Sequence, residues 1–150
     1  MTISEPRPPA AWLTRWFPYH AMQGPWPRSC PSLHRWTLWR GRRDVYLHCW
    51  VGDDWAPDFH DHSRDMWSIG LRGAYAEQTP HGTMRYGAPW LRWFPAEHQH
   101  RIHVVRGPVW TLVVAGRRRR VSHFIIKGRL ANTAHYAAEH SQGAHAGPTC

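Results

Sequence analysis

The sequence contains few cysteines and no long hydrophobic run. Its three cysteines (Cys30, Cys49 and Cys150) are odd in number and widely spaced. They predict neither a disulfide framework nor a C-x-x-C metal knuckle. No apolar run approaches the roughly 18 residues of a membrane-spanning helix. The first residues include an early Glu and several Pro, so we expect no secretory signal peptide. These absences lead us to expect a cytoplasmic protein that does not contact a membrane.

Other residue types are abundant. The 150 residues fit one domain with one core, and the hydrophobic share of 42% is typical of a globular protein. The 11 Trp exceed ordinary usage. Because the 13 Pro and 12 Gly interrupt the chain every few residues, they favour many short strands over long helices.

The formal net charge is +9, which leaves nucleic acid, an anionic surface or an acidic substrate open as partners. Part of this charge is local, since 117–120 reads RRRR. We interpret this run as a solvated turn between two strands. A nucleic-acid contact remains an alternative, although no helix-turn-helix, zinc-finger or RNP pattern accompanies the run.

Residues 33–128 carry a series of strand signals separated by turns. The segments 34–40 and 45–51 predict a hairpin, and 66–79 predicts strand on both sides of a bend at Gly73. Further strand signals lie at 83–86, 90–94, 98–105, 109–116 and 121–128. This spacing predicts an all-β, antiparallel sandwich or barrel.

The flanking segments differ in character. Residues 1–32 are rich in Pro and Trp, and predict an irregular arm packed by its aromatic side chains. Residues 129–150 predict a short Ala-rich helix followed by a flexible tail. An aromatic arm would also suit a homodimer interface.

Two histidines one residue apart follow an aspartate-rich loop. On a strand, His60 and His62 would point to the same face and could share a metal ion, while Asp61 would point away. A catalytic metal site needs a third ligand. The segment 98–103 supplies three candidates, His98, His100 and His103.

The spacing of these histidines resembles the two short motifs of the cupin superfamily. His60-x-His62 is followed by three residues, Met66, six residues and Gly73, with Met66 where the family has a Glu ligand. Further along, Pro95, Glu97 and His100 resemble the second motif, with Glu97 in place of its Gly. The resemblance covers roughly residues 34–126. It implies a double-stranded β-helix, a small antiparallel barrel, and selects His100 as the third ligand.

The loss of the Glu ligand leaves a three-histidine set. Such a set resembles that of the thiol dioxygenases, which hold Fe(II), and the chain is also similar to small cupin-like proteins of phages and bacteria. The resemblance implies an Fe(II)-dependent dioxygenase that binds O2 and a small, anionic substrate. Mn, Ni, Cu or Zn would also suit three imidazoles. The Ser-His-Tyr set of cysteine dioxygenases is absent, because Val113, Ala115 and Arg117 occupy its positions.

Several other residues are candidates for the site. Arg85 and Arg92 could orient an anionic substrate group, and Tyr86 could donate a phenol hydrogen bond. Asp65 could hydrogen-bond a ligand imidazole, or could instead pair with Arg64 or Arg72. We interpret His48 as a hydrogen-bonded core histidine.

Two alternatives to a dioxygenase remain open. One is a non-catalytic module that binds nucleic acid or a sugar-phosphate through its basic surface. The other is a metal-independent epimerase or isomerase of the cupin type. That chemistry needs a His–Asp base, such as His60 or His62 with Asp65, and a tyrosine acid, Tyr75 or Tyr86.

Overall fold

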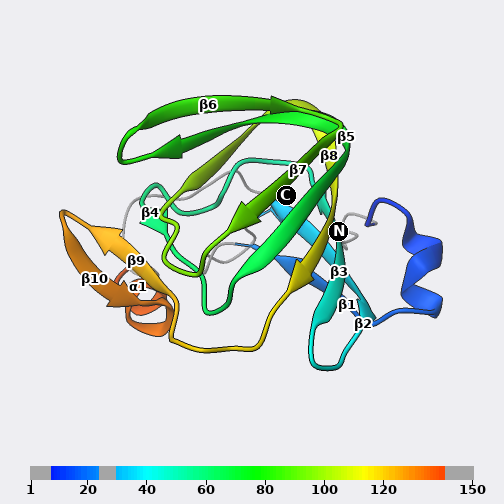
Figure 1. Cartoon of the computed structure of the whole chain (residues 1–150), viewed down its shortest axis with the longest axis horizontal. Coiled ribbons are helices and arrows are strands. Elements are labelled where there is room, and N and C mark those ends of the chain that lie inside the picture. Colours follow the sequence, from blue (N-terminus) through cyan, green and yellow to red (C-terminus); the bar gives the residue numbers. More distant parts are fainter. Residues whose placement is uncertain (1–7, 24–29, 141–150) are drawn as a thin grey trace, which may run out of the picture.

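The computed structural model describes residues 8–23 and 30–140, and it consists mainly of antiparallel strands (Figure 1). The elements in chain order are the 3-10 helix η1 (Ala11–Arg15), β1 (Tyr19–Met22), β2 (Leu33–Trp39), β3 (Asp44–Trp50), β4 (Phe59–His60), β5 (Met66–Thr79), β6 (Gly82–Gly87), β7 (Trp90–Phe94), β8 (Arg101–Ala115), β9 (His123–Ile126), β10 (Arg129–Asn132) and the helix α1 (Thr133–His140). The predicted all-β architecture with a short C-terminal helix is confirmed.

The strands form two sheets. Seven strands make the larger sheet, in the order β1-β2-β3-β8-β5-β6 with β7 also paired to β5. The smaller sheet has the order β10-β9-β4. The predicted hairpin corresponds to β2 and β3, which pair with Trp36 opposite Leu47. Trp36 is fully buried against Cys49, so this hairpin contributes one core cluster of the larger sheet.

Two long strands dominate the larger sheet. The sequence predicts two strands over 98–105 and 109–116, but the structure has the single strand β8 of 15 residues. The predicted turn between them is wrong because both parts of β8 pair with the same partner. That pairing runs along β5 from Gln78 opposite Arg101 to Met66 opposite Ala115.

The bend predicted at Gly73 is present. Gly73 has a φ of +86°, and the register between β5 and β8 shifts around it. A Cβ at this position would lie 2.7 Å from the carbonyl oxygens of both Arg106 and Pro108, so only glycine fits. Beyond the bend the second partner of β5 changes from β7 to β6. The glycine that follows His60 and His62 in the sequence is therefore required by the geometry of this bend.

The smaller sheet carries the C-terminal helix. In β4, Phe59 and His60 pair with β9, where Phe124 lies opposite His60. Tyr136 of α1 is fully buried and stacks on Phe124 with ring centroids 4.0 Å apart. Its hydroxyl donates a 2.7 Å hydrogen bond to Asp58. The helix therefore supports the strand that ends in His60, and Figure 1 shows this unit at the end of the molecule away from η1.

The N-terminal arm is more regular than predicted. Within it, β1 pairs with β2 and extends the larger sheet, and η1 places Leu13 in the cluster around Trp36. The aromatic side chains are not all packed, since Trp12 and Trp16 are exposed. Residues 1–7, 24–29 and the predicted tail from 141 onward lie outside the described residues. Dimerisation through the arm stays a prediction.

The spacing of the cysteines predicts no disulfide framework, but the structure contains a disulfide-bonded cysteine. Cys30 is disulfide-bonded, whereas Cys49 is free and buried.

Neither η1 nor α1, the helices of the described residues, has the length and apolarity to cross a membrane.

Candidate metal centre

Backbone hydrogen bonds bring the three predicted histidines together. His60 ends β4 and forms an isolated antiparallel bridge with His100, in which each backbone N–H donates to the other carbonyl at 3.0 Å. Although His62 lies outside the two-residue strand, its N–H donates to the carbonyl of Ala96 at 2.8 Å. The segments that carry the two cupin-like motifs are thus joined directly beside the imidazoles.

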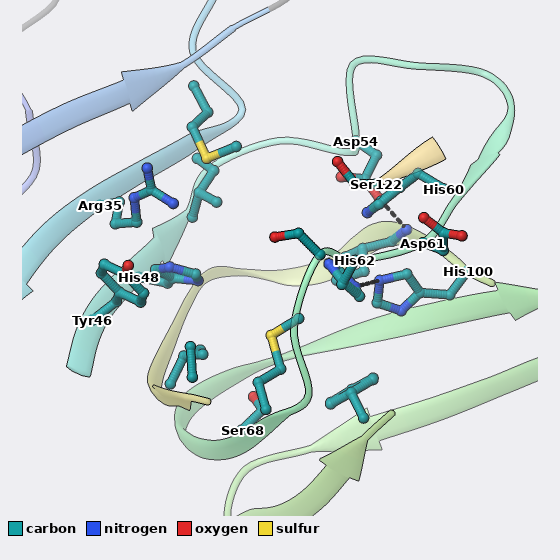
Figure 2. A pocket seen from close by; sticks show the side chains of 18 of the residues that line it. Arg35, Tyr46, His48, Asp54, His60, Asp61, His62, Ser68, His100 and Ser122 are labelled. Atoms are coloured by element: carbon teal, nitrogen blue, oxygen red, sulfur yellow. Dashed lines mark hydrogen bonds and ion pairs between the residues drawn. The ribbon is translucent and has the colours of Figure 1, made fainter. Parts of the chain in front are cut away.

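The three imidazoles converge on one point. His62 Nε2 lies 2.9 Å from His100 Nε2, and one ring nitrogen from each of His60, His62 and His100 lies within 4.8 Å of the others. Figure 2 shows the three rings grouped at one side of a pocket. Three nitrogen donors at such separations could hold a metal ion.

Burial keeps two of these imidazoles neutral. It lowers the pKa of His60 to about 4, and only in part does the Asp54 carboxylate 3.8 Å away oppose it. The pKa of His62 lies well below its usual value because of burial and the neighbouring His100. A neutral imidazole has a free lone pair, which is the form that binds a metal ion.

Glu77 orients His100, a role that no motif in the sequence indicates. The residue is 1% exposed, and its Oε1 accepts hydrogen bonds from His100 Nδ1 at 2.7 Å and from His98 Nε2 at 2.9 Å. Because Nδ1 of His100 donates to the carboxylate, Nε2, which faces His62, is the nitrogen left to bind a metal ion. Carboxylate–histidine pairs of this kind support metal ligands in other proteins.

Arg92 and Tyr75 hold the carboxylate in turn. Arg92 donates to Glu77 Oε2 at 2.6 Å and to the hydroxyl oxygen of Tyr75 at 2.8 Å. Burial alone would raise the pKa of Glu77, but hydrogen bonds from His100, His98 and Arg92 outweigh it and hold that pKa far below its usual value. Glu77 is therefore negatively charged at neutral pH and lies in contact with His98 and His100.

A second cluster of side chains could also hold a metal ion. Glu77, His98 and His100 also have ligand atoms within 4.8 Å of one another. Glu77 and His98 do not line the cavity described below, whereas His60, His62 and His100 do. A metal on the second cluster would also displace the proton that His100 shares with Glu77. The three-histidine cluster is therefore the better candidate. His103, the third candidate from sequence, lies outside both clusters, on Asp53 and Gln78.

Ion pairs fix the loop that carries His60 and His62. Asp61 is not part of the three-histidine cluster and pairs with Arg120 at 2.9 Å. Asp65 accepts hydrogen bonds from the backbone N–H of Ala96 at 2.8 Å and from Arg119 at 2.6 Å, and not from an imidazole, Arg64 or Arg72. Half of the basic run at 117–120 thus anchors this loop, while Arg117 and Arg118 are exposed.

A cavity of about 490 Å³ adjoins the histidines (Figure 2). Met66, which replaces the family's Glu, lies on its wall. Other residues that line the cavity include Arg35, Tyr46, His48, Tyr75 and Thr111.

The substrate-orienting residues expected from sequence lie outside this cavity. Arg85 is exposed on β6, and Tyr86 packs against Tyr75 from behind. Arg92 is committed to Glu77. Arg35, Arg40 and Arg64 line the cavity instead, and Arg35 is the one that lies over the ring of Tyr46. Strand parity could have indicated it, because Arg35 and His48 lie opposite each other in the predicted hairpin.

Comparisons with solved structures identify the fold. No family model and no curated protein matches the sequence. An RmlC-like cupin from Shewanella frigidimarina superposes with a TM-score of 0.52 at 13% identity, over 70% of this chain and 88% of that one. A sugar phosphate isomerase from a cupin superfamily, from Silicibacter pomeroyi, gives 0.51 at 17% identity, over 62% and 65%. Fe(II) HppE gives 0.54 at 9% identity, over 69% and 57%.

At these identities the comparisons establish the fold. The chain has the cupin fold, as the two motifs predict. Within that fold it presents a three-histidine cluster at the wall of a cavity, with a buried carboxylate behind one of the histidines.

Proposed function

We propose that the protein is a metal-dependent cupin enzyme that binds one Fe(II) through His60, His62 and His100 and oxidises a small, anionic molecule with O2. The observation that carries this proposal is the convergence of three imidazole nitrogens within 4.8 Å at the wall of a cavity. Sites with three protein ligands and open positions are typical of catalytic metals.

The residues present fit such an ion. Neutral imidazoles suit Fe(II), and also Zn, Cu and Ni, and without a ligand carboxylate the centre would keep a charge of +2. Bound Fe(II) would supply the activation of O2. The chain would contribute the rest: Glu77 fixes the ring of His100, Asp61 and Arg120 fix the ligand loop, and the cavity provides space for the substrate beside the histidines.

Metal content is the first test. Wild-type protein without an affinity tag, purified without chelators and reconstituted anaerobically with Fe(II), should carry about one metal ion per chain by elemental analysis. His62→Ala should lose that metal, whereas His103→Ala should retain it, because His103 lies outside the cluster. A wild-type protein that stays metal-free, or equal metal in both variants, would refute the site.

The identity of the metal and the reaction need a second test. Iron that remains bound in competition with Mn(II), together with O2 consumption when small carboxylates are added, supports the oxidation. Binding of zinc but not iron contradicts it, and so does an iron-loaded protein that consumes no O2.

One observation favours a second candidate, a metal-independent isomerase. His60 Nδ1 lies 3.8 Å from Asp54, and Tyr75 lines the same cavity, which gives a histidine–carboxylate pair and a phenol. Burial, however, raises the pKa of Tyr75 to about 12, which makes it a weak acid. Turnover of a sugar-phosphate that persists in the presence of a chelator would favour this candidate over the first.

A further inference from the structure

Three polar side chains form a row on the cavity wall. Arg35 of β2 lies opposite His48 of β3, and His48 lies opposite Thr111 of β8. Residues directly opposite each other in a sheet point to the same face. All three line the cavity, and Figure 2 shows Arg35 and His48 across the pocket from His62 and His100.

The row lacks hydrogen-bond partners within the described residues. His48 Nε2 and Thr111 Oγ1 are buried and have none, and Thr111 is only 3% exposed. Buried polar groups are almost always hydrogen-bonded, and one that is not costs on the order of 1–3 kcal/mol. Two neighbouring exceptions that face one cavity indicate a place where a ligand supplies the missing partner.

The charge of Arg35 is also uncompensated. Its guanidinium has no carboxylate partner among residues 8–23 and 30–140, and it lies over the ring of Tyr46, 5.0 Å from the centroid. Two other arginines line the cavity: Arg64 is neutralised by Asp44 at 2.7 Å, and Arg40 is exposed to solvent. Burial lowers the pKa of Arg35; Tyr46 opposes this effect, and the nearby cations Arg40 and Arg64 add to it.

The cavity's own carboxylates are already engaged. Asp61 pairs with Arg120, and Asp54 accepts the backbone N–H of Ile102 at 2.7 Å. Neither neutralises Arg35. One cation with two further hydrogen-bonding groups beside it matches a group with one negative charge and several acceptor oxygens.

We propose that Arg35, His48 and Thr111 bind the carboxylate group of the substrate, whose other end reaches the three histidines. The inference rests on the proposed function for the role of the histidines, but the binding of a carboxylate does not depend on a metal. Because Trp50, Phe94 and Phe124 also line the cavity, the rest of the molecule is expected to be apolar or aromatic.

Binding of benzoate tests the row directly. Isothermal titration of metal-free wild-type protein with benzoate should show binding, and the uncharged isostere benzamide should bind at least tenfold more weakly. Arg35→Gln should weaken benzoate binding about tenfold or more, since a hydrogen bond to a charged group contributes about 1.5–3 kcal/mol. Thr111→Val should weaken it less. Arg85→Gln, which removes the same charge from exposed β6, should leave it unchanged.

The outcomes separate this inference from the proposed function. Circular dichroism and the metal content of Arg35→Gln establish that the variant is folded with its histidines intact. If benzoate binds through Arg35 but no metal ever binds, the subsite stands and the enzyme proposal fails. If metal binds normally, yet benzoate and benzamide bind alike or Arg35→Gln binds benzoate as wild type does, the subsite is refuted.

Discussion

Glu77 Oε1 lies 2.7 Å from His100 Nδ1, although the two residues are separated by 23 positions in the sequence. Their strands explain the contact. Glu77 lies opposite Ile102 in the β5–β8 pairing, and His100 precedes Ile102 by two residues, so it lies on the same face. The buried anion is therefore placed behind a candidate metal ligand by the register of two strands.

The first prediction concerns this pair. Glu77→Gln keeps the shape of the side chain but removes its charge, so the basicity and the orientation of His100 should suffer. We expect the affinity for Fe(II) or Zn(II) to fall about 10–100-fold. Titration against a chelator of known affinity measures the change. The control is Glu97→Gln, because Glu97 is 56% exposed and pairs with arginines at the surface. Equal affinities in the two variants would show that Glu77 plays no part in metal binding.

A second prediction separates a structural role for Arg92 from substrate binding. Arg92→Met removes the cation that pairs with buried Glu77, whose side chain is 2% exposed. His98 and His100 still contact the carboxylate, so we expect a loss of about 3 kcal/mol in the free energy of unfolding. Urea denaturation measures it. Arg85→Met should change the same quantity by less than about 0.5 kcal/mol. A fully stable Arg92→Met protein that fails only in ligand binding would restore Arg92 as a substrate contact.

The third prediction tests the bend in β5. Gly73 and Gly128 have similar φ values, +86° and +79°, but only Gly73 has backbone atoms where a Cβ would lie. Gly128→Ala should cost about 1 kcal/mol of stability, from backbone strain alone. Gly73→Ala should cost at least about 2 kcal/mol more, because the carbonyls of Arg106 and Pro108 must move. Similar losses in thermal or urea denaturation would contradict a steric role for the bend.

The fourth prediction concerns pH. Burial, with Arg35, lowers the pKa of His48 to about 3 in the folded protein, against 6.5 as its ordinary value. Between these values the unfolded state binds the additional proton, so the stability that neutral His48 provides is complete above pH 6.5 and is lost as the pH falls toward 3. In metal-free protein, His48→Gln should reduce the fall in melting temperature between pH 7 and pH 4.5.

The matched control for that series is Thr111→Val, which alters the same polar row without removing a titrating group. His60 titrates in this window as well, with its pKa lowered to about 4, so some acid dependence should remain in both variants. If His48→Gln and Thr111→Val show the same dependence on pH as wild type, His48 is not the buried neutral group described here.

The sequence alone determined the parts that depend on local spacing. Short strands between Gly and Pro predicted an antiparallel β fold. The resemblance of the spacing of His60, His62, Gly73 and His100 to the cupin motifs then indicated the cupin fold and the three side chains that converge. Gly73 also indicated the bend in its strand, because a positive φ at one position favours glycine there whatever the strand pairs with.

Tertiary structure decided the rest, because it depends on strand register and on what each buried charge finds as a partner. Nothing near Glu77 in the sequence indicates that it contacts His100. The sequence also does not distinguish the roles of Arg35, Arg85 and Arg92, because those roles depend on how their strands pair. The register assigns Arg92 to Glu77, Arg85 to the surface and Arg35 to the cavity wall beside His48. A shift of one residue would have exchanged these faces, since side chains alternate along a strand.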